Sequence, residues 1–575
     1  MLSIKDLHKL AKEDSSSLPQ YKLAILGDCA TQHIASSIKG YARYVELGMN
    51  IFDADYNQIG IQAMDDKSEL YAFHPDAILI FMCVEKLYEA YCSTPFAQRS
   101  HFSDTIFTNI KTYWELINTH TKTTILQTNF PLFNDAVFGN YANKVETSFV
   151  YQLRKLNYLL MEGCQQTKNV YLIDIDAIQT QCGRPAFTDP KLYYIAKMPI
   201  SLDLLPAVAK SVTDTIQALR GMVKKCIVVD LDNTLWGGII GDDGMEGIQI
   251  GELGTGRAYS DLQRWLKELK NRGILLAVCS KNNEDIAKEP FEKHPEMVLR
   301  LDDFSMFVAN WEDKASNIRR IQQTLNLGMD SFVFLDDNPF ERKLVQGMIP
   351  EITIPELPED PAQYVPYLRS LNLFETASFS LTDMDRTQQY REEAERTTLQ
   401  TAFTSYEDYL ASLNMKAVAA PFDEFHTPRI AQLTQRSNQF NLRTIRYTEA
   451  QIQELTHDEN LITRRYSLKD RFGEYGLISV VILEKRPDKK LFINTWLMSC
   501  RVLKRTMEEF IINDIISVAK ENGFTQVIGE YLKTPKNAMV EDIYERMGFV
   551  RKDGLFIADV ANFNLNKSQV QREES

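Results

Sequence analysis

The sequence predicts a multidomain α/β protein of 575 residues. Short apolar runs, too short for buried helices, alternate with helical patterns along the first two thirds, as is typical of parallel sheets covered by helices. The last third places consecutive strands before a helix, which indicates a separate α+β unit. With domains of about 100–200 residues, the length allows three or four of them. The 44% of hydrophobic residues suffices for their cores.

Three apolar runs in the central segment each end in polar residues. Residues 226–229 precede Asp230-Leu231-Asp232-Asn233-Thr234, residues 274–279 precede Ser280-Lys281-Asn282-Asn283, and residues 332–335 precede Asp336-Asp337-Asn338. Open α/β sheets bind ligands at the carboxyl edge of their parallel strands. We therefore expect these polar residues to meet at one edge of a central sheet.

The first of these motifs places two carboxylates two residues apart. Such a pair is repulsive unless a cation lies between the groups, so it suggests a Mg²⁺ site that holds a phosphate oxygen. One aspartate can attack phosphorus while the other exchanges protons with the leaving group. Taken alone the motif is a weak signal, because a solvated turn after a strand explains it too.

A lysine stands at the start of a predicted helix between the second and third runs. Asn310-Trp311-Glu312-Asp313-Lys314 precedes a helical pattern carried by Ile318, Ile321 and Leu325. An ammonium group near a helix start can neutralise both phosphate and nucleophile. A lysine alone would indicate only a solvated helix face.

The order of nucleophile, hydroxyl, lysine and acidic pair resembles the haloacid dehalogenase (HAD) phosphohydrolases. The resemblance implies Asp230 as phosphoryl acceptor and Asp232 as general acid/base. It also implies Ser280 and Lys314 as phosphate binders. A second aspartate two residues after the first fits phosphoryl chemistry better than dehalogenation.

The same resemblance implies a Mg²⁺ cofactor and a small phosphorylated substrate. The implied metal ligands are Asp230, Asp232, Asp336 and Asp337, with Asp232 contributing its backbone carbonyl. Thr234 and Asn282 stand beside these groups and are expected to contact the substrate. The short spacings leave no room for a lid domain, so either the substrate is bulky or neighbouring domains control water.

Composition excludes several classes of function. A formal charge of −14 argues against a general nucleic-acid binder, which needs a basic face. No stretch approaches the length of a membrane span, and the first residues lack the apolar core of a signal peptide. The eight cysteines have no paired spacing. That pattern favours reduced thiols and a cytoplasmic location.

The first segment begins with a strand over residues 23–26 that leads into Gly27-Asp28-Cys29-Ala30. Residues 77–81 and 124–127 indicate further strands. The opening resembles the SGNH or GDSL hydrolases, with Cys29 at the place of their nucleophilic serine. Hydrolysis by a Ser-His-Asp triad is not expected, because the Gly-x-Asn-Asp and Asp-x-x-His motifs are missing. Cys29 near a helix start is a candidate nucleophile or acyl carrier, or else a buried structural cysteine.

The last third, which ends in Tyr544-Glu545-Arg546-Met547-Gly548-Phe549, resembles the GNAT acyltransferases. Their helix-start loop binds the coenzyme A pyrophosphate through backbone N–H groups and needs glycines for close approach. Lys504 and Thr506 stand at those places, so binding of coenzyme A or a phosphopantetheine arm stays an open expectation. Arg501, Lys504 and Arg505 can instead bind a single phosphate through their charges, or form a solvated basic turn.

Residues 230–244, 334–342, 438–441 and 496–501 together are similar to the FkbH-like proteins, and the resemblance extends over most of the chain. The expected parts are an SGNH- or flavodoxin-like α/β domain (1–222), a HAD-like core without a large cap (223–357), a linker with a charged helix (358–400), a GNAT-like domain (401–566) and a polar tail (567–575).

The family resemblance implies a Mg²⁺-dependent phosphohydrolase fused to acyl-transfer domains. Such an enzyme would dephosphorylate an acyl donor such as 1,3-bisphosphoglycerate through an aspartyl-phosphate, and would pass the glyceryl group to an acyl carrier protein. One alternative is a capless HAD phosphatase that acts on a protein or sugar phosphate in polysaccharide biosynthesis. Another is a scaffold whose flanking domains only bind partners.

Overall fold

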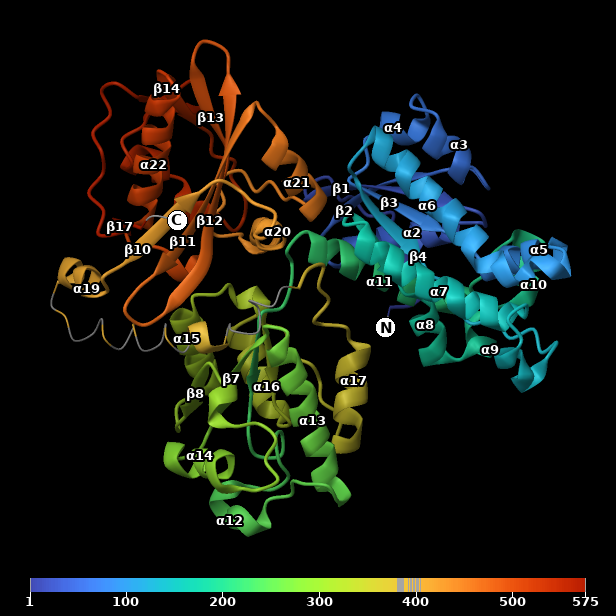
Figure 1. Ribbon diagram of the computed structural model, residues 1–575. Coiled ribbons are helices and arrows are strands. Elements are labelled where there is room, and N and C mark those ends of the chain that lie inside the picture. Colours follow the sequence, from blue (N-terminus) through green and yellow to red (C-terminus); the bar gives the residue numbers. More distant parts are fainter. Residues whose placement is uncertain are drawn as a thin grey trace. The chain divides into compact units, whose positions relative to one another are not determined.

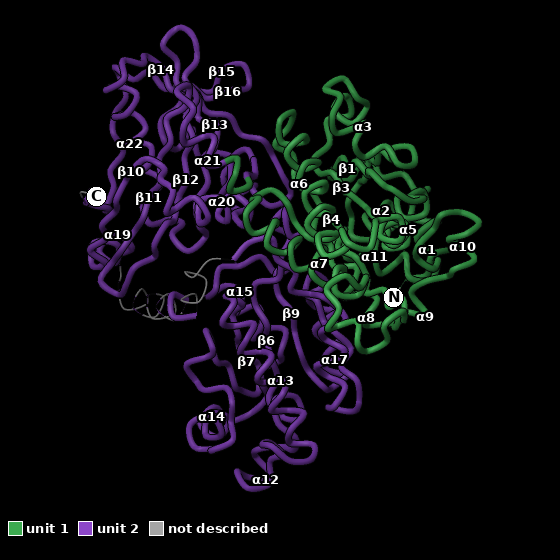
Figure 2. Tube along the Cα trace, turned by 45° about the vertical axis from the view of Figure 1, so that its right-hand side comes forward, with its two compact units in different colours: residues 1–217, 448–451 green, residues 218–447, 452–575 purple. Residues whose placement is uncertain are grey.

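The computed structural model describes residues 2–379, 387–390, 392, 396, 399, 403 and 405–573 (Figure 1). The chain divides into two compact units, residues 1–217 with 448–451 and residues 218–447 with 452–575 (Figure 2). The second unit contains two separate sheets, and the predicted boundaries inside it stay predictions. Among the described residues, no helix has both the length and the apolar character needed to cross a membrane.

The first unit is built on a five-stranded parallel sheet in the order β2-β1-β3-β4-β5. Its strands are β1 (Gln20–Gly27), β2 (Gly48–Asp53), β3 (Ala77–Phe81), β4 (Thr124–Thr128) and β5 (Val170–Ile173). Its helices are α1 (Ile4–Leu10), α2 (Gln32–Tyr44), α3 (Ile59–Met64), α4 (Glu69–Phe73), α5 (Val84–Ser93), α6 (Phe102–His120), α7 (Phe149–Gln166), α8 (Ile175–Cys182), α9 (Arg184–Phe187), α10 (Pro190–Ala196) and α11 (Leu205–Leu219). The three predicted strands are present. Every residue of β3 is buried, which explains its continuous apolar run.

The central sheet has four parallel strands in the order β8-β7-β6-β9. They are β6 (Cys226–Val229), β7 (Leu275–Ser280), β8 (Met306–Ala309) and β9 (Phe332–Leu335). The helices are α12 (Ile240–Gly247), α13 (Gly254–Asn271), α14 (Glu284–Lys293), α15 (Lys314–Leu325), α16 (Pro339–Met348) and α17 (Tyr364–Ser370). Ile227 and Val229 pack in one apolar cluster with α13, whereas Cys226 and Val228 pack in another with α15. Both faces are therefore covered.

The last sheet has eight strands in the order β15-β16-β14-β13-β12-β11-β10-β17. They are β10 (Lys416–Ala420), β11 (Leu461–Lys469), β12 (Glu474–Arg486), β13 (Lys490–Met498), β14 (Gln526–Gly529), β15 (Val550–Lys552), β16 (Leu555–Asp559) and β17 (Gln571–Arg572). Its helices are α19 (Tyr406–Ser412), α20 (Thr427–Arg436), α21 (Glu449–His457), α22 (Met507–Glu521) and α23 (Ile543–Arg546). The predicted hairpin joins β12 to β13, where Asp488 and Lys489 adopt positive φ angles, as tight hairpin turns require.

Two observations concern the predicted linker and the predicted polar tail, whose bounds stay predictions. Within the predicted linker, α17 places Leu368 in the apolar cluster shared with α13, so this segment belongs to the packing of the central sheet. Within the predicted polar tail, β17 pairs with β10 and Val570 is buried. The charged helix predicted within the linker (358–400) lies largely outside the described residues.

Candidate active site

The carboxyl ends of adjacent central strands bring the predicted residues together. Asp230 follows β6, Ser280 ends β7 and Asp336 follows β9, and all three are buried. Because β6 lies between β7 and β9 in one parallel sheet, these residues share one edge, as the sequence predicted. Ser280 is paired in register with Ala309 of β8, and its carbonyl accepts a hydrogen bond from the Asn310 backbone.

Lys314 lies between two of the carboxylates. Its Nζ is 2.8 Å from Asp230 Oδ2 and 2.6 Å from Asp336 Oδ2. The residue is the first of α15, whose cap is the Asp313 side chain. Burial alone would lower the pKa of Lys314, but the Asp230 and Asp336 carboxylates outweigh it and raise that pKa. The side chain, 3% exposed, is therefore a fixed ammonium group.

Asp230, Asp336 and Asp337 form a carboxylate cluster whose ligand oxygens all lie within 4.8 Å of one another. Asp230 Oδ1 is buried, and no hydrogen-bond partner for it is present among the described residues. Burial, followed by the charge of Asp230, raises the pKa values of both Asp336 and Asp337. Three hard oxygen donors face one ammonium group, so the residues present fit a divalent cation such as Mg²⁺.

Asp232 is held apart from the carboxylate cluster. Its Oδ1 accepts hydrogen bonds from Trp236 Nε1 and from the backbone N–H of Ile240, each at 3.0 Å, and its Oδ2 accepts one from Asn282 Nδ2 at 3.1 Å. The side chain of Asp232 is therefore not a member of the cluster, in line with the backbone role implied for it. Burial raises its pKa despite the hydrogen bonds from Ile240 and Trp236.

Thr234 and Asn282, two of the residues expected to contact the substrate, contact carboxylates of the site. The fully buried Thr234 hydroxyl donates to Asp337 Oδ1 at 3.2 Å and accepts from the Asp337 backbone N–H at 3.1 Å. Asn282, 5% exposed, donates to Asp232. Thr234 therefore orients Asp337, and Asn282 orients Asp232, each from the end of a neighbouring strand. Contact of either side chain with the substrate stays a prediction.

The sequence analysis missed other residues that orient Asp232 or the carboxylate cluster. Trp236 and Ile240 orient Asp232, as described above. The Asn338 backbone donates to Asp336 Oδ1 at 2.8 Å, and Arg342 Nη1 donates to the carbonyls of Asp336 and Asp337 at 2.7 Å. Arg342 lies six residues after Asp336, in the first turns of α16, and this spacing could have predicted its contact with the backbone of the acidic pair. The Asp232 contacts depend on the turn in which Asn233 has a φ of 54°, and although asparagine adopts this conformation more readily than most residues, that preference does not indicate which groups the turn brings to Asp232.

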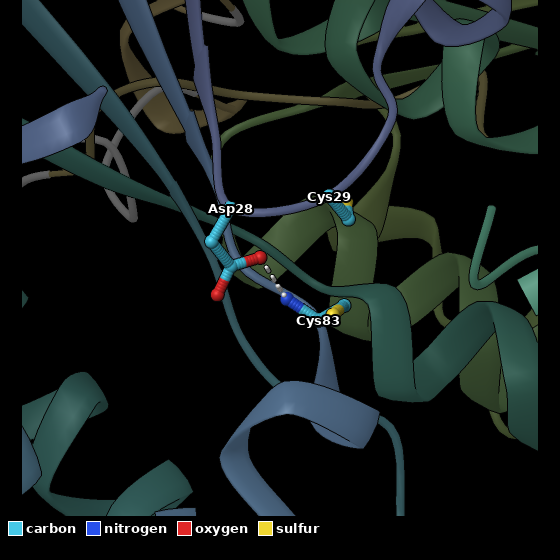
Figure 3. Close-up of side chains that lie close together, drawn as sticks. All are labelled: Asp28, Cys29 and Cys83. Carbon is cyan, nitrogen blue, oxygen red and sulfur yellow. Dashed lines mark hydrogen bonds between the residues drawn. The ribbon is translucent and has the colours of Figure 1, made fainter. Parts of the chain in front are cut away.

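Cys29 lies in a second buried cluster in the first unit (Figure 3). Ligand atoms of Asp28, Cys29 and Cys83 lie within 4.8 Å of one another, and the Cys83 backbone donates to Asp28 Oδ1 at 2.9 Å. Interaction with the Cys83 thiol, together with burial, raises the pKa of Cys29 well above its usual value. The helix-start effect predicted to favour a thiolate is therefore overridden, and Cys29 is 2% exposed. This donor set of sulfur and carboxylate suits a softer cation than Mg²⁺.

The basic loop after β13 does not form the predicted three-residue phosphate grip. Arg501 is 7% exposed, and its Nη2 donates to the Tyr475 carbonyl at 3.2 Å. Arg505 turns toward the Tyr475 hydroxyl and Asp470, and Lys504 is exposed. Lys504 and Thr506 have φ angles of 62° and 59°. Glycine would adopt this conformation without strain, and the alternating turn sends consecutive cations in different directions.

Comparison with known proteins gives the following matches. A family model described as the FkbH N-terminal domain matches residues 22–217. The N-terminal part of the protein BF1531 from Bacteroides fragilis, which contains a phosphatase domain complexed with Mg, is 47% identical. That match covers 66% of this chain and 100% of that chain, with a TM-score of 0.63. The ribosomal-protein-S18-alanine N-acetyltransferase from Escherichia coli is 11% identical over 26% of this chain and 98% of its own, with a TM-score of 0.20. No match was found among curated proteins.

Proposed function

The chain belongs to the FkbH-like family with a HAD phosphatase domain, and on this premise we propose that its carboxylate cluster removes phosphate from a small phosphorylated substrate with bound Mg²⁺. The observation that carries the proposal is the buried contact of Lys314 with both Asp230 and Asp336. A cation fixed between two carboxylates at a sheet edge has no packing role that an apolar side chain could not fill.

Asp230 is the proposed nucleophile. A carboxylate oxygen attacks phosphorus, the ester oxygen leaves with the bonding electron pair, and an aspartyl-phosphate remains on Asp230. Lys314 offsets the charge that gathers on the phosphoryl oxygens and already touches the attacking carboxylate. The Ser280 hydroxyl ends the adjacent strand, where it can donate to the same phosphoryl group.

Asp232 is the proposed general acid and base. Burial raises its pKa, which makes a proton on this carboxyl easier to hold, and the protonated form can deliver that proton to the leaving oxygen. The resulting carboxylate then takes a proton from the water that hydrolyses the aspartyl-phosphate. Trp236 and Asn282 hold this side chain through separate carboxylate oxygens, so the proton is exchanged at a fixed position.

Asp230, Asp336 and Asp337, with the Asp232 carbonyl, are the proposed Mg²⁺ ligands. Bound Mg²⁺ supplies charge neutralisation for the phosphate oxygens. Thr234 and Arg342 fix Asp337 through its side chain and its backbone carbonyl, so the ligand set is oriented before the cation binds.

The finer proposal concerns the substrate. We propose that the donor is an acyl phosphate such as 1,3-bisphosphoglycerate, and that the glyceryl group passes to an acyl carrier protein. Cys29 is the proposed acyl acceptor: its sulfur attacks the acyl carbon, the thiol proton is lost and inorganic phosphate leaves. Because Cys29 is buried, this step requires an opening of the surrounding loops. All eight cysteines are free thiols, which fits the proposed cytoplasmic location.

The test measures phosphate release from 1,3-bisphosphoglycerate by the full-length protein with and without Mg²⁺. Mass spectrometry of the intact protein searches in parallel for a glyceryl adduct. We expect Mg²⁺-dependent release that is lost in Asp230→Asn, and an adduct that is lost in Cys29→Ala. Mg²⁺-dependent release that persists in Asp230→Asn, beyond the one phosphate per chain that acylation of Cys29 itself liberates, would refute the phosphatase site, whereas an adduct that persists in Cys29→Ala would refute only the acyl role.

A phosphatase that acts on a larger phosphorylated partner is the second candidate. It is favoured by two large apolar side chains beside site residues: Trp311 is 71% exposed and precedes Lys314, while Phe340 is 68% exposed and follows Asp337. Under this reading, Trp311→Ala lowers kcat/KM for a macromolecular phosphate about tenfold but leaves a small aryl phosphate unaffected. Equal losses on both substrates would exclude docking through Trp311.

A further inference from the structure

A thiol cluster, formed by Asp28, Cys29 and Cys83, lies at the carboxyl edge of the first sheet (Figure 3). Cys29 comes two residues after Gly27 at the end of β1, and Cys83 comes two residues after Phe81 at the end of β3. Gly27 and Phe81 are register partners in the parallel pair of β1 and β3, and the Asp28 backbone N–H donates to the Phe81 carbonyl at 3.2 Å. The strand register therefore brings the two thiols close together.

The turn that carries Cys29 is fixed by close packing and by a hydrogen bond. A Cβ atom on Gly27 would lie 2.5 Å from Thr31 Cγ2 and 3.2 Å from the Cys29 carbonyl oxygen, so a side chain at this position has no room. The Cys83 backbone donates to Asp28 Oδ1 at 2.9 Å and so links the two strand ends. The donor atoms are therefore oriented by the fold itself.

The thiol cluster concentrates buried acidic groups. Asp28 is 7% exposed and Cys83 is 3% exposed. Burial raises the pKa of Asp28 to about 6. The Cys83 thiol and burial raise the pKa of Cys29, and the charges of Asp28 and Glu85 add to this effect. Glu85, in the first turn of α5, has a buried Oε2, and no hydrogen-bond partner for this atom is present among the described residues. Ionised forms of these groups are therefore poorly solvated.

The nearby Lys86 does not have the position that Lys314 has in the carboxylate cluster. Lys86 Nζ donates to the Asp28 backbone carbonyl at 3.4 Å and to Asn57 Oδ1 at 2.5 Å. These contacts direct the ammonium group to the backbone of Asp28, whereas Lys314 contacts the carboxylates themselves. A cation bound among the donor atoms of the thiol cluster would offset the charge of their ionised forms.

The sulfur donors select the kind of cation. Two thiols and one carboxylate match the ligands of zinc, whereas Mg²⁺ prefers oxygen ligands alone. Zinc–ligand distances of about 2.0–2.3 Å place tetrahedral ligand atoms about 3.3–3.8 Å apart. Because the three donor atoms lie within 4.8 Å of one another, small side-chain rotations bring them to one ion. In Figure 3 both cysteine side chains lie on the same side of Asp28.

We propose that Asp28, Cys29 and Cys83 together bind one thiophilic divalent cation of the zinc type. Each thiol loses its proton to the solvent when its sulfur binds the cation, and no electron is transferred. Three protein ligands leave a fourth tetrahedral position for water. The inference does not rest on the proposed phosphatase activity, because the thiol cluster and the carboxylate cluster lie in different units and share no residue. A bound cation would compete with the acyl group proposed for Cys29.

The test is a titration of reduced, chelator-treated full-length protein with Co²⁺, an optical probe of zinc sites. Thiolate ligands give bound Co²⁺ a charge-transfer absorption in the near ultraviolet. Carboxylate ligands do not, so the carboxylate cluster contributes nothing to this signal. We expect the absorption to saturate at one Co²⁺ per chain. Zn²⁺ should abolish it at an equal concentration, whereas Mg²⁺ in about 100-fold excess should leave it unchanged, because thiolates favour zinc over magnesium.

Variants locate the binding. Cys29→Ser and Cys83→Ser should each remove at least about half of the absorption and weaken Co²⁺ binding at least about tenfold, since each removes one of two thiolate ligands. Asp28→Asn should weaken binding but keep the absorption. The matched control Cys92→Ser, which alters an exposed thiol of α5, should change neither.

Two further measurements keep the outcome decisive. Cys83→Ser should retain Mg²⁺-dependent phosphate release from a simple phosphate ester, which separates this inference from the phosphatase proposal. Circular dichroism melts show whether each variant folds, and the titration of the unaltered protein decides where one does not. Absence of the near-ultraviolet absorption at millimolar Co²⁺, its displacement by Mg²⁺, or its survival in both Cys29→Ser and Cys83→Ser would overturn the inference.

Discussion

The carboxylate cluster around Asp230 and the thiol cluster around Cys29 both lie at the carboxyl ends of parallel strands. The buried groups are charged in the first cluster, whereas the Cys29 thiol is neutral in the second. In the first, a buried ammonium contacts two carboxylates and one carboxylate oxygen lacks a partner. In the second, burial and a neighbouring thiol keep Cys29 protonated. A strand end therefore supplies a position, and the surrounding charges decide whether that position is reactive.

Removal of the nucleophile is the strongest way to test this contrast. Asp230→Asn should lower Mg²⁺-dependent phosphate release at least about 1000-fold, because an amide cannot form the phosphoryl intermediate. The matched control Asp261→Asn, a half-exposed residue of α13 that pairs with Arg257 and Arg264, and Cys29→Ala should both retain release from a simple phosphate ester. Comparable losses in Cys29→Ala would mean that the thiol cluster takes part in the phosphatase reaction.

Removal of the central cation should reduce stability. Lys314→Met leaves Asp230 and Asp336 buried without their partner, and breaking a buried pair costs about 3 kcal/mol, or about 150-fold in the folding equilibrium. Urea denaturation at pH 8 without Mg²⁺ measures this change. The control is Lys293→Met, whose side chain is 65% exposed in a surface pair with Glu289. An equal effect in both variants would show that Lys314 is not the charge that holds the cluster together.

For the thiol cluster we expect low chemical reactivity. Cys29 should react with iodoacetamide about 100-fold more slowly than the exposed Cys92 at pH 8, because burial and a raised pKa both reduce accessible thiolate. Peptide mass spectrometry over time resolves the two cysteines. Rapid labelling of Cys29 in the folded protein would show an open, reactive thiol and would remove the contrast between the clusters.

Sequence alone predicted much of the central sheet for a physical reason. Residues 226–229 are buried on both faces, so their apolar run is continuous and its polar end marks the site. By contrast, β8 was missed because its four residues include the half-buried Met306 and Phe307. The strand β17 could not be predicted, because Gln571 and Arg572 are exposed and their pairing with β10 is set by tertiary contacts.

Some features of the candidate sites were likewise predictable from the sequence, and others were not. The convergence of Asp230, Ser280 and Asp336 follows from parallel strand order, which the motifs revealed. The placement of Arg501 in a cavity and of Arg505 against Asp470 follows from two left-handed residues in one loop. Glycine is the residue that most readily adopts a positive φ, but Lys504 and Thr506 adopt it here. The sequence therefore gave no sign that Arg501 and Arg505 would point in different directions.

The smallest expected effect concerns pH and metal binding. Burial and the Asp230 charge raise the pKa of Asp336 to about 6, so protons compete with Mg²⁺ for this carboxylate as pH falls through that value. We expect the apparent Mg²⁺ affinity to be nearly constant from pH 8 to 7 and to weaken about fivefold from pH 6 to 5. Calorimetric titration of the substrate-free protein in buffers with different ionisation enthalpies also counts the protons released. An affinity that stays unchanged down to pH 5 would place the cation away from Asp336, and the thiol cluster, whose titrating groups differ, would then need to be tested for it.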